Sequence, residues 1–249
     1  MRLRTLPEDA APARPGFRGL ADRAIFRSGM SLILAVRDDR DVVMASDGRV
    51  LGEDLGVMSN DSLKTLALNA TVCLGLAGPT DVMRQVLGSL GIKCRGSHPI
   101  DLLGVCQEVA CPVDVDYRDA RDEMTNVLRW MTRRVSSRPT SPSIPAVILA
   151  GRSNDRPALC EWRDRARAME TTGTAGYSDA IAGSLPEERT LERAEFLRMV
   201  RGGRSTDRAE ERLTRAVRYC AGYFGVKGPV SRTVFVRRLT RGFRLIRVE

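Results

Sequence analysis

The sequence has few of the features that mark membrane, disordered or secreted proteins. No apolar run approaches the roughly 18 residues that a membrane-spanning helix needs. Hydrophobic residues make up 43% of the 249 residues, so the chain can bury a core and is not expected to be disordered. The first residues carry no continuous apolar segment after their basic start, which argues against a secretory signal.

Lysine and histidine are scarce, although the chain is basic. It has 40 lysine and arginine residues against 31 acidic residues, a formal charge of +9, yet only three lysines, Lys64 among them, and one histidine, His98. The arginines alternate with acidic residues, as in residues 118–123, instead of gathering with aromatic residues on one surface. A dedicated nucleic-acid binder is therefore not favoured, although the arginine-rich residues 232–247 leave it open as an alternative.

The cysteines give no sign of a disulfide framework or a zinc site. They are irregularly spaced, at Cys73, Cys94, Cys106, Cys111, Cys160 and Cys220. Such spacing, without a secretory signal, predicts reduced thiols in a cytoplasmic protein. The stretch from Cys94 to Cys111, which also holds His98, contains no Cys-x-x-Cys pair, so ordinary thiols are favoured over four zinc ligands. We expect neither a metal nor a cofactor.

The chain divides at about residue 30. Residues 1–30 contain Pro7, Pro12 and Pro15, which break any regular helix, and we interpret them as an N-terminal extension or propeptide. Residues 31–249 carry strand and helix patterns over most of their length, and we predict that they form a single domain.

Apolar runs separated by polar turns predict groups of strands that alternate with helices. Strands are expected at 31–36, 41–45, 64–68, 71–76, 146–150, 158–162, 168–172, 233–238 and 243–248. Helices are expected at about 80–90, near 100–110, and at 116–135, 190–200 and 206–223, with a loop at 136–145. The tryptophans Trp130 and Trp162 are expected to fill the core. This order predicts an α+β class in which two sheets lie between layers of helices.

An ordered set of residues carries the clearest functional signal. Ser31 opens the first predicted strand, and residues 42–49 read Val-Val-Met-Ala-Ser-Asp-Gly-Arg on the second. Lys64 opens a later strand, and Gly78 ends a Leu-Ala-Gly turn from strand to helix. Over residues 31–238 this pattern resembles the proteasome β-subunit superfamily of N-terminal-nucleophile (Ntn) hydrolases, which includes the peptidase of the bacterial ATP-dependent two-component protease. The resemblance implies a four-layer αββα sandwich.

The resemblance also implies a role for five residues. Ser31 stands at the position of the nucleophile, whose own freed α-amine is the base, and Asp47 and Lys64 stand at the positions of the family's aspartate and active-site lysine. Gly78 stands at the glycine whose backbone N–H forms the oxyanion hole, and Thr174, in a Gly-Thr-Ala-Gly turn, stands at a supporting serine. The implied partners are a peptide or protein substrate, further copies of the chain in a homo-oligomeric ring, and an ATPase that feeds the ring.

These residue types suit the hydrolysis of an amide bond. A serine hydroxyl is a weak nucleophile at neutral pH and needs an adjacent base, and an α-amino group with a pKa of about 7.7 can serve as one. Lys64, paired with Asp47, would add positive potential that lowers the pKa of this amine. The N–H of Gly78 would stabilise the oxyanion by about 3–4 kcal/mol, the usual contribution of one such donor.

Three departures from the family pattern leave a non-catalytic structural or regulatory subunit open as the alternative. The nucleophile position holds serine, where proteolytic members mostly carry threonine. Met30 precedes Ser31, where autoprocessing members usually have glycine, and residues 223–228 hold no recognisable Asp-x-x-Ser motif. Ser31 has a free amine only if residues 1–30 are removed, or if translation begins at Met30 and this initiator methionine is then removed, and we take the second route as a hypothesis. The stretch 92–115 is expected either to cover the site or to contact a neighbouring subunit.

Overall fold

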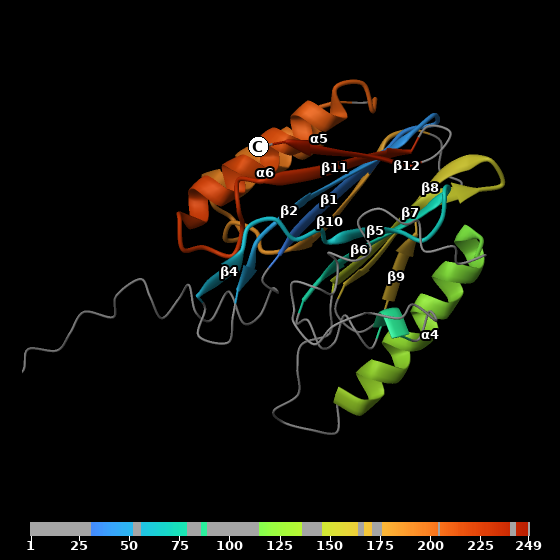
Figure 1. Cartoon of the computed structure of the whole chain (residues 1–249). Coiled ribbons are helices and arrows are strands. Elements are labelled where there is room, and N and C mark those ends of the chain that lie inside the picture. The colour runs from blue at the N-terminus through green and yellow to red at the C-terminus, as the bar shows by residue number, and fades with distance from the viewer. Residues whose placement is uncertain are drawn as a thin grey trace, which may run out of the picture.

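The computed structural model of the chain describes residues 31–51, 56–78, 86–88, 115–135, 146–163, 167–170, 176–203, 205–239 and 243–248. The predicted N-terminal extension, the helix predicted near 100–110 and the loop predicted at 136–145 lie outside these residues. Of the helix predicted at about 80–90, residues 86–88 are described, and they are helical. The described part belongs to the mixed α+β class, as predicted (Figure 1).

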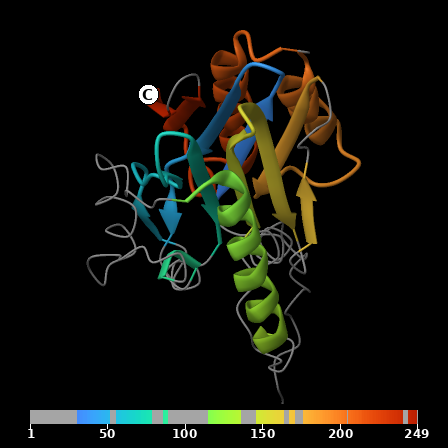
Figure 2. The same cartoon turned by 90° about the vertical axis from the view of Figure 1, so that its right-hand side faces the viewer.

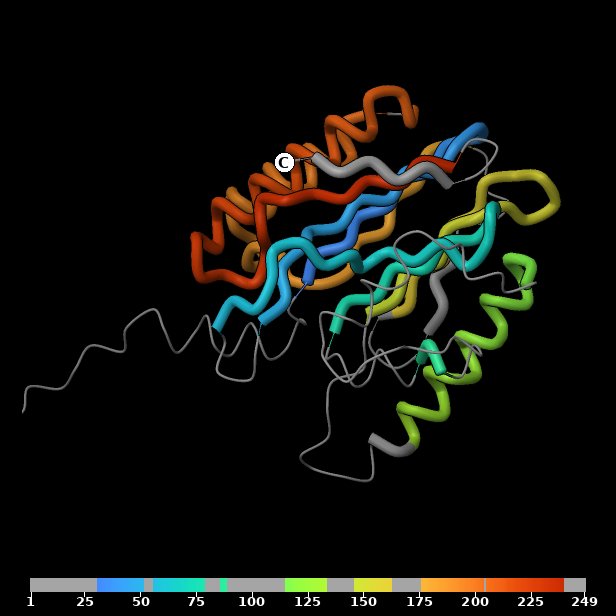
Figure 3. The backbone as a smooth tube through the Cα atoms, in the orientation of Figure 1, coloured from blue at the N-terminus to red at the C-terminus, as the bar shows by residue number. Residues whose placement is uncertain are grey.

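Five antiparallel strands form the first sheet. They are β1 (Leu32–Arg37), β2 (Val42–Asp47), β10 (Ser178–Gly183), β11 (Val234–Leu239) and β12 (Phe243–Val248). Their order is β10-β1-β2-β11-β12. Figure 3 shows β1 and β2, in blue, beside β11, in red, so strands from the two ends of the described chain meet in one sheet.

Five further antiparallel strands form the second sheet. They are β5 (Thr65–Ala67), β6 (Val72–Ala77), β7 (Ala146–Ser153), β8 (Arg156–Arg163) and β9 (Arg167–Glu170), in that order across the sheet. The tight turn between β7 and β8 holds Asn154 and Asp155 at φ values of 52° and 60°, which suits the right-handed twist of a hairpin. Two short strands, β3 (Val50–Leu51) and β4 (Val57–Ser59), pair with each other separately.

The two sheets pack face to face around an apolar core. Successive side chains of a strand point to opposite faces. In β1, Ile33 and Ala35 therefore join the core between the sheets, whereas Leu32, Leu34 and Val36 join the core on the outer side. The core between the sheets consists of Ile33, Ala35, Val42, Met44, Cys73, Ala77, Ile148, Ala150, Leu159, Ala180, Ala182 and Leu239.

Two helices, α5 (Leu191–Arg201) and α6 (Ala209–Phe224), cover the outer face of the first sheet (Figure 1). The hydroxyl of Thr190 caps α5 by accepting a hydrogen bond from the backbone N–H of Arg193 at 3.1 Å. In α6, Leu213 and Val217 are completely buried against the sheet. Burial of each such side chain stabilises the fold by about 1.5–3 kcal/mol.

The helix α4 (Tyr117–Val135) covers the outer face of the second sheet (Figure 2). Its buried residues Met124, Leu128 and Met131 recur at helical spacing and form the apolar stripe that faces the sheet. Trp162 of β8 is buried, as predicted. The prediction for Trp130 is wrong: this side chain lies off the apolar stripe of α4 and is 48% exposed.

The sequence patterns missed three strands. The strands β3 and β4 are too short, at two and three residues, to show an alternation. The strand β10 reads Ser-Asp-Ala-Ile-Ala-Gly, in which small residues and aspartate hide any strand signal. It is a strand because all six of its residues pair with β1. No helix within the described residues is long and apolar enough to cross a membrane.

Candidate active site

Asp47, the last residue of β2, is the centre of the candidate site. Its side chain is completely buried. One carboxylate oxygen, Oδ1, accepts two hydrogen bonds of 2.8 Å, one from the backbone N–H of Leu32 and one from the ammonium of Lys64. The ammonium therefore lies within two hydrogen-bond lengths of the backbone nitrogen that follows Ser31. The structure thus brings three of the predicted site residues, Ser31, Asp47 and Lys64, to one place.

The second carboxylate oxygen of Asp47 is held by backbone groups. Oδ2 accepts hydrogen bonds from the N–H of Arg49 at 2.9 Å and from the N–H of Ser231 at 3.2 Å. The hydroxyl of Ser231 in turn accepts a hydrogen bond of 3.0 Å from the N–H of Gly48. Within the described residues the carboxylate has four donors, which stabilise its negative charge although the side chain is completely buried.

Lys64 is the one side-chain cation bound to this carboxylate among the described residues. It precedes β5 and is 3% exposed, and its carbonyl accepts a hydrogen bond from Leu76 N of β6 at 3.0 Å. Burial lowers the pKa of the Lys64 ammonium, the adjacent Asp47 carboxylate acts to raise it, and the Arg49 guanidinium lowers it further. The net direction is downward, because loss of hydration disfavours the charged form more than one carboxylate favours it.

Ser31 is fixed from both neighbouring strands. On the β2 side, the N–H of Leu32 binds Asp47, and on the β10 side the carbonyl of Ser31 accepts a hydrogen bond from Ser184 N at 2.7 Å. Gly183 makes this second contact possible. Its φ is 108°, and a Cβ atom at this position would overlap the Ser31 carbonyl oxygen at 1.7 Å. Ser31 itself is 3% exposed.

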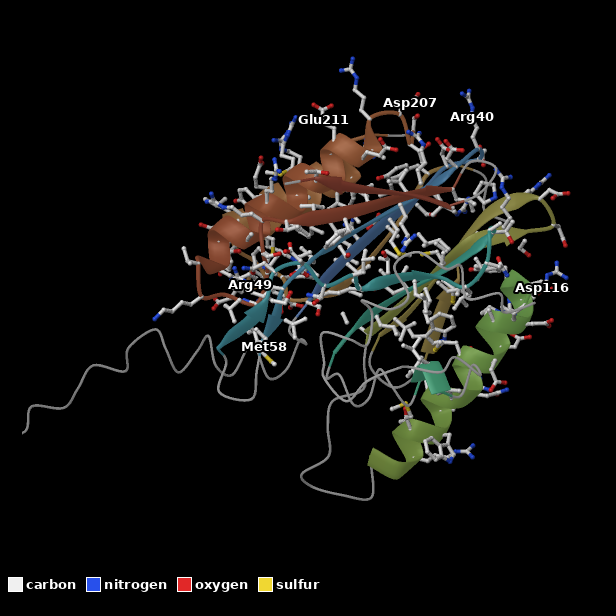
Figure 4. The ribbon with its side chains drawn as sticks, in the orientation of Figure 1. Arg40, Arg49, Met58, Asp116, Asp207 and Glu211 are labelled. Carbon is white, nitrogen blue, oxygen red and sulfur yellow. The ribbon has the colours of Figure 1, made fainter. Side chains whose placement is uncertain are left out.

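Arg49 ties the turn after α6 to the site. Its guanidinium donates hydrogen bonds to the carbonyls of Val226 and Gly228 and to the side chain of Asn60. Burial lowers the pKa of Arg49, and the nearby Asp47 carboxylate opposes that shift. Figure 4 shows Arg49 beside β4 and the C-terminal end of α6, with Met58 labelled at the same end of the molecule. With Asp47, Lys64 and Arg49, the buried cluster carries one net positive charge.

Of the other two predicted site residues, the structure describes Gly78 but not Thr174. Gly78 directly follows β6, two residues beyond Leu76, the residue that binds the Lys64 carbonyl. Its backbone has φ 155°, in the region that favours glycine. Thr174 lies outside the described residues, so its predicted supporting role stays a prediction.

Ser231 is a residue of the candidate site that the sequence patterns missed. The Asp-x-x-Ser motif of the family would correspond to residues 223–228, and Ser231 lies three residues further along. The sequence does contain one feature that could have identified it. Ser231 is a small hydroxyl residue that comes three residues before the apolar strand β11, at the end where β11 pairs with Asp47.

Comparison with known proteins gives no family assignment. No protein-family model matches the chain, and no curated protein matches it significantly. The described residues contain no group of three or more histidine, cysteine, aspartate or glutamate side chains that could hold a metal ion. The resemblance of residues 31–238 to the Ntn hydrolases therefore stays a prediction.

Proposed function

We propose that this chain is an amide-bond hydrolase of the Ntn type, a peptidase that uses Ser31 as its N-terminal nucleophile once residues 1–30 are lost. We also propose that its fold is the four-layer αββα sandwich of that superfamily. The order of helices α5 and α6, first sheet, second sheet and helix α4 supports this architecture.

One observation carries the proposal. A single oxygen, Asp47 Oδ1, binds both the Lys64 ammonium and the N–H of Leu32, each at 2.8 Å. This arrangement puts a buried cation next to the residue that would become the chain terminus. A positive charge there disfavours protonation of a nearby α-amine. The amine therefore stays in its neutral form, which is the form that can act as a base.

The proposed reaction is the hydrolysis of an amide bond by Ser31. The α-amine of Ser31 accepts the hydroxyl proton while Oγ attacks the carbonyl carbon of the substrate, which gives a tetrahedral intermediate. The backbone N–H of Gly78 stabilises its oxyanion. The intermediate collapses when the leaving nitrogen takes the proton from the α-ammonium, which leaves an ester on Oγ. Water, deprotonated by the same amine, then hydrolyses the ester and regenerates Ser31.

The test has two measurements on the full-length chain expressed in its native host. Intact-mass spectrometry is expected to find a mature species that begins at Ser31. A peptide electrophile that needs both a hydroxyl and an α-amine on one residue is then expected to label this species once. A chain that keeps residues 1–30 and takes no label would contradict the proposal.

Matched variants separate labelling at Ser31 from labelling elsewhere. Ser31→Ala is expected to abolish the label. Ser205→Ala is the control, because Ser205 lies near Asp207, at the end of α6 opposite Arg49 (Figure 4). This variant is expected to be labelled like the wild type. Equal labelling of both variants would place the reactive group elsewhere.

The alternative is a non-catalytic subunit of the same fold. It is favoured by one observation: thirty residues precede Ser31 in the sequence, and in the intact chain its nitrogen is an amide and not an amine. In that case Asp47 and Lys64 are structural, and the chain contributes to a homo-oligomeric ring without cutting a substrate. An ATPase partner belongs to both proposals. A native-host chain that is processed to Ser31 but is never labelled would favour this alternative.

A further inference from the structure

Two hydroxyl groups next to the Asp47 cluster are buried without a partner. Ser46 is completely buried and Ser62 is 3% exposed. Neither Ser46 Oγ nor Ser62 Oγ forms a hydrogen bond within the described structure. Buried hydroxyls nearly always have a partner, either in the protein or in an ordered water molecule. Two such groups close to one site therefore call for a common explanation.

The two serines lie on segments that meet at the end of β2. Ser46 directly precedes Asp47 and pairs across the sheet with Ile33 on one side and Phe235 on the other. Its side chain has the same strand parity as Met44, so it points between the two sheets. The N–H of Ser62 donates a hydrogen bond of 2.9 Å to the carbonyl of Gly48, two residues beyond Ser46.

Lys64 supplies the complementary donors. It lies two residues after Ser62, and since Ser62 binds Gly48 and Lys64 binds Asp47, the segment 62–64 runs along the end of β2. An ammonium has three N–H donors. Within the described residues, the Lys64 ammonium uses one of them, toward Asp47 Oδ1. Two ammonium donors and two hydroxyls that have no partner among the described residues thus belong to segments that meet at the end of β2.

We propose that Lys64, Ser46 and Ser62 bind one water molecule between the two sheets. The water oxygen accepts a hydrogen bond from the Lys64 ammonium, and its two hydrogens are donated to Ser46 Oγ and Ser62 Oγ. A water molecule needs two to four polar partners to stay in a buried site, and this site supplies three. The water gives the ammonium a second fixed partner besides Asp47.

Thermal unfolding of the full-length chain tests the proposal. Ser46→Ala and Ser62→Ala are each expected to lower the unfolding temperature by about 2–4 °C, because each removes a hydrogen bond from the bound water. The matched control is Ser178→Ala. The Ser178 hydroxyl also has no partner among the described residues, but Ser178 is only half-buried and lies at the other end of β1, opposite Arg37. Its removal is expected to leave the unfolding temperature unchanged or higher.

The double variant gives the sharper result. If one water connects the two hydroxyls, Ser46→Ala and Ser62→Ala together lower the unfolding temperature by less than the sum of the single shifts. If the hydroxyls have no common ligand, both single variants behave like the Ser178→Ala control and the shifts add. That second pattern would overturn the proposal.

A crystal structure of the full-length chain provides an independent measurement. It is expected to show a solvent peak within about 3.2 Å of Lys64 Nζ, Ser46 Oγ and Ser62 Oγ, and to lack that peak in the double variant. A wild-type structure without the peak would refute the bound water. Neither result depends on Ser31 being catalytic: a chain that is never processed or labelled can still hold the water, and a labelled chain can lack it.

Discussion

Replacement of Asp47 by asparagine tests the centre of the site. The amide has nearly the same size as the carboxylate but carries no charge, and it turns one of the two acceptor oxygens into a donor. If its NH₂ group takes the place of Oδ2, it faces the N–H groups of Arg49 and Ser231, and if it takes the place of Oδ1, it faces Leu32 N and Lys64 Nζ. Either orientation leaves two buried donors without an acceptor and the Lys64 ammonium without its carboxylate.

We expect Asp47→Asn to lower the free energy of unfolding by about 3–5 kcal/mol, the usual cost of removing one partner from a buried ion pair. Natural domains have only about 5–15 kcal/mol in total, so the loss is a large fraction of the stability. Urea unfolding, followed by circular dichroism, measures it. With a typical slope of about 2 kcal/mol per molar, the midpoint falls by roughly 2 M.

The pH dependence of this loss identifies its cause. Burial already lowers the pKa of Lys64, and without Asp47 no adjacent carboxylate opposes that shift. A lysine whose folded pKa is depressed destabilises the fold most at low pH, where it is protonated, and the penalty disappears as the pH rises toward the unfolded value of about 10.4. The loss caused by Asp47→Asn is therefore expected to be larger at pH 7 than at pH 10.

Lys64→Met is the matched variant. It leaves the Asp47 carboxylate buried but keeps its three backbone donors, so it is expected to cost less than Asp47→Asn. The double variant is expected to cost less than the sum of the two single variants, since the two side chains interact directly. If Asp47→Asn stays within about 1 kcal/mol of the wild type, or if the two variants are additive, the ion pair does not hold this site together.

Three further predictions concern other parts of the fold. Gly183→Ala is expected to lower the thermal unfolding midpoint by more than an ordinary Gly→Ala change, because φ is 108° and the new methyl group meets a backbone carbonyl; calorimetry checks this, and an unchanged midpoint would contradict it. Burial alone would raise the pKa of Asp38, but hydrogen bonds from Thr206 and from neighbouring backbone N–H groups outweigh it and lower the pKa. The contribution of Asp38 to stability is then present above the unfolded pKa of about 3.9 and is lost as the pH falls through the lower folded value. In urea titrations, Asp38→Asn is therefore expected to lower the free energy of unfolding by about 1–2 kcal/mol at pH 7 and by less at pH 3. Leu213→Ala is expected to cost about 2–5 kcal/mol in the same assay and Leu191→Ala almost nothing, since the first side chain is completely buried and the second is 86% exposed.

The elements that the sequence predicts well are those whose signal is local. The strand predicted at 31–36 is β1 at Leu32–Arg37, and the helix predicted at 116–135 is α4 at Tyr117–Val135. In both, apolar residues recur at the spacing of the element that buries them, so each side chain reports its own environment. The boundaries move by a residue or two because the ends of an element depend on its neighbours.

The strand β10 shows where local signals end. Its residues Ser178–Gly183 have low strand propensity, and they become a strand because β1 offers an unpaired edge. The same contact carries Gly183 to the carbonyl of Ser31, so the missed strand is also the one that fixes the candidate nucleophile from that side. Long-range pairing of this kind leaves no trace in the composition of the segment.

The candidate site also combines residues that the sequence can identify with contacts that it cannot. The pairing of Asp47 with Lys64 is an expectation from the resemblance to the Ntn hydrolases, which depends on recognisable side chains, and the structure joins the two at 2.8 Å. The other donors to Asp47, at Leu32, Arg49 and Ser231, are backbone N–H groups, which every residue except proline possesses and which no residue type announces. From the side chains alone, Lys64 would be expected to stabilise the Asp47 carboxylate by itself. In the structure, three backbone N–H groups stabilise it as well. The smaller cost expected for Lys64→Met measures how large that backbone share is.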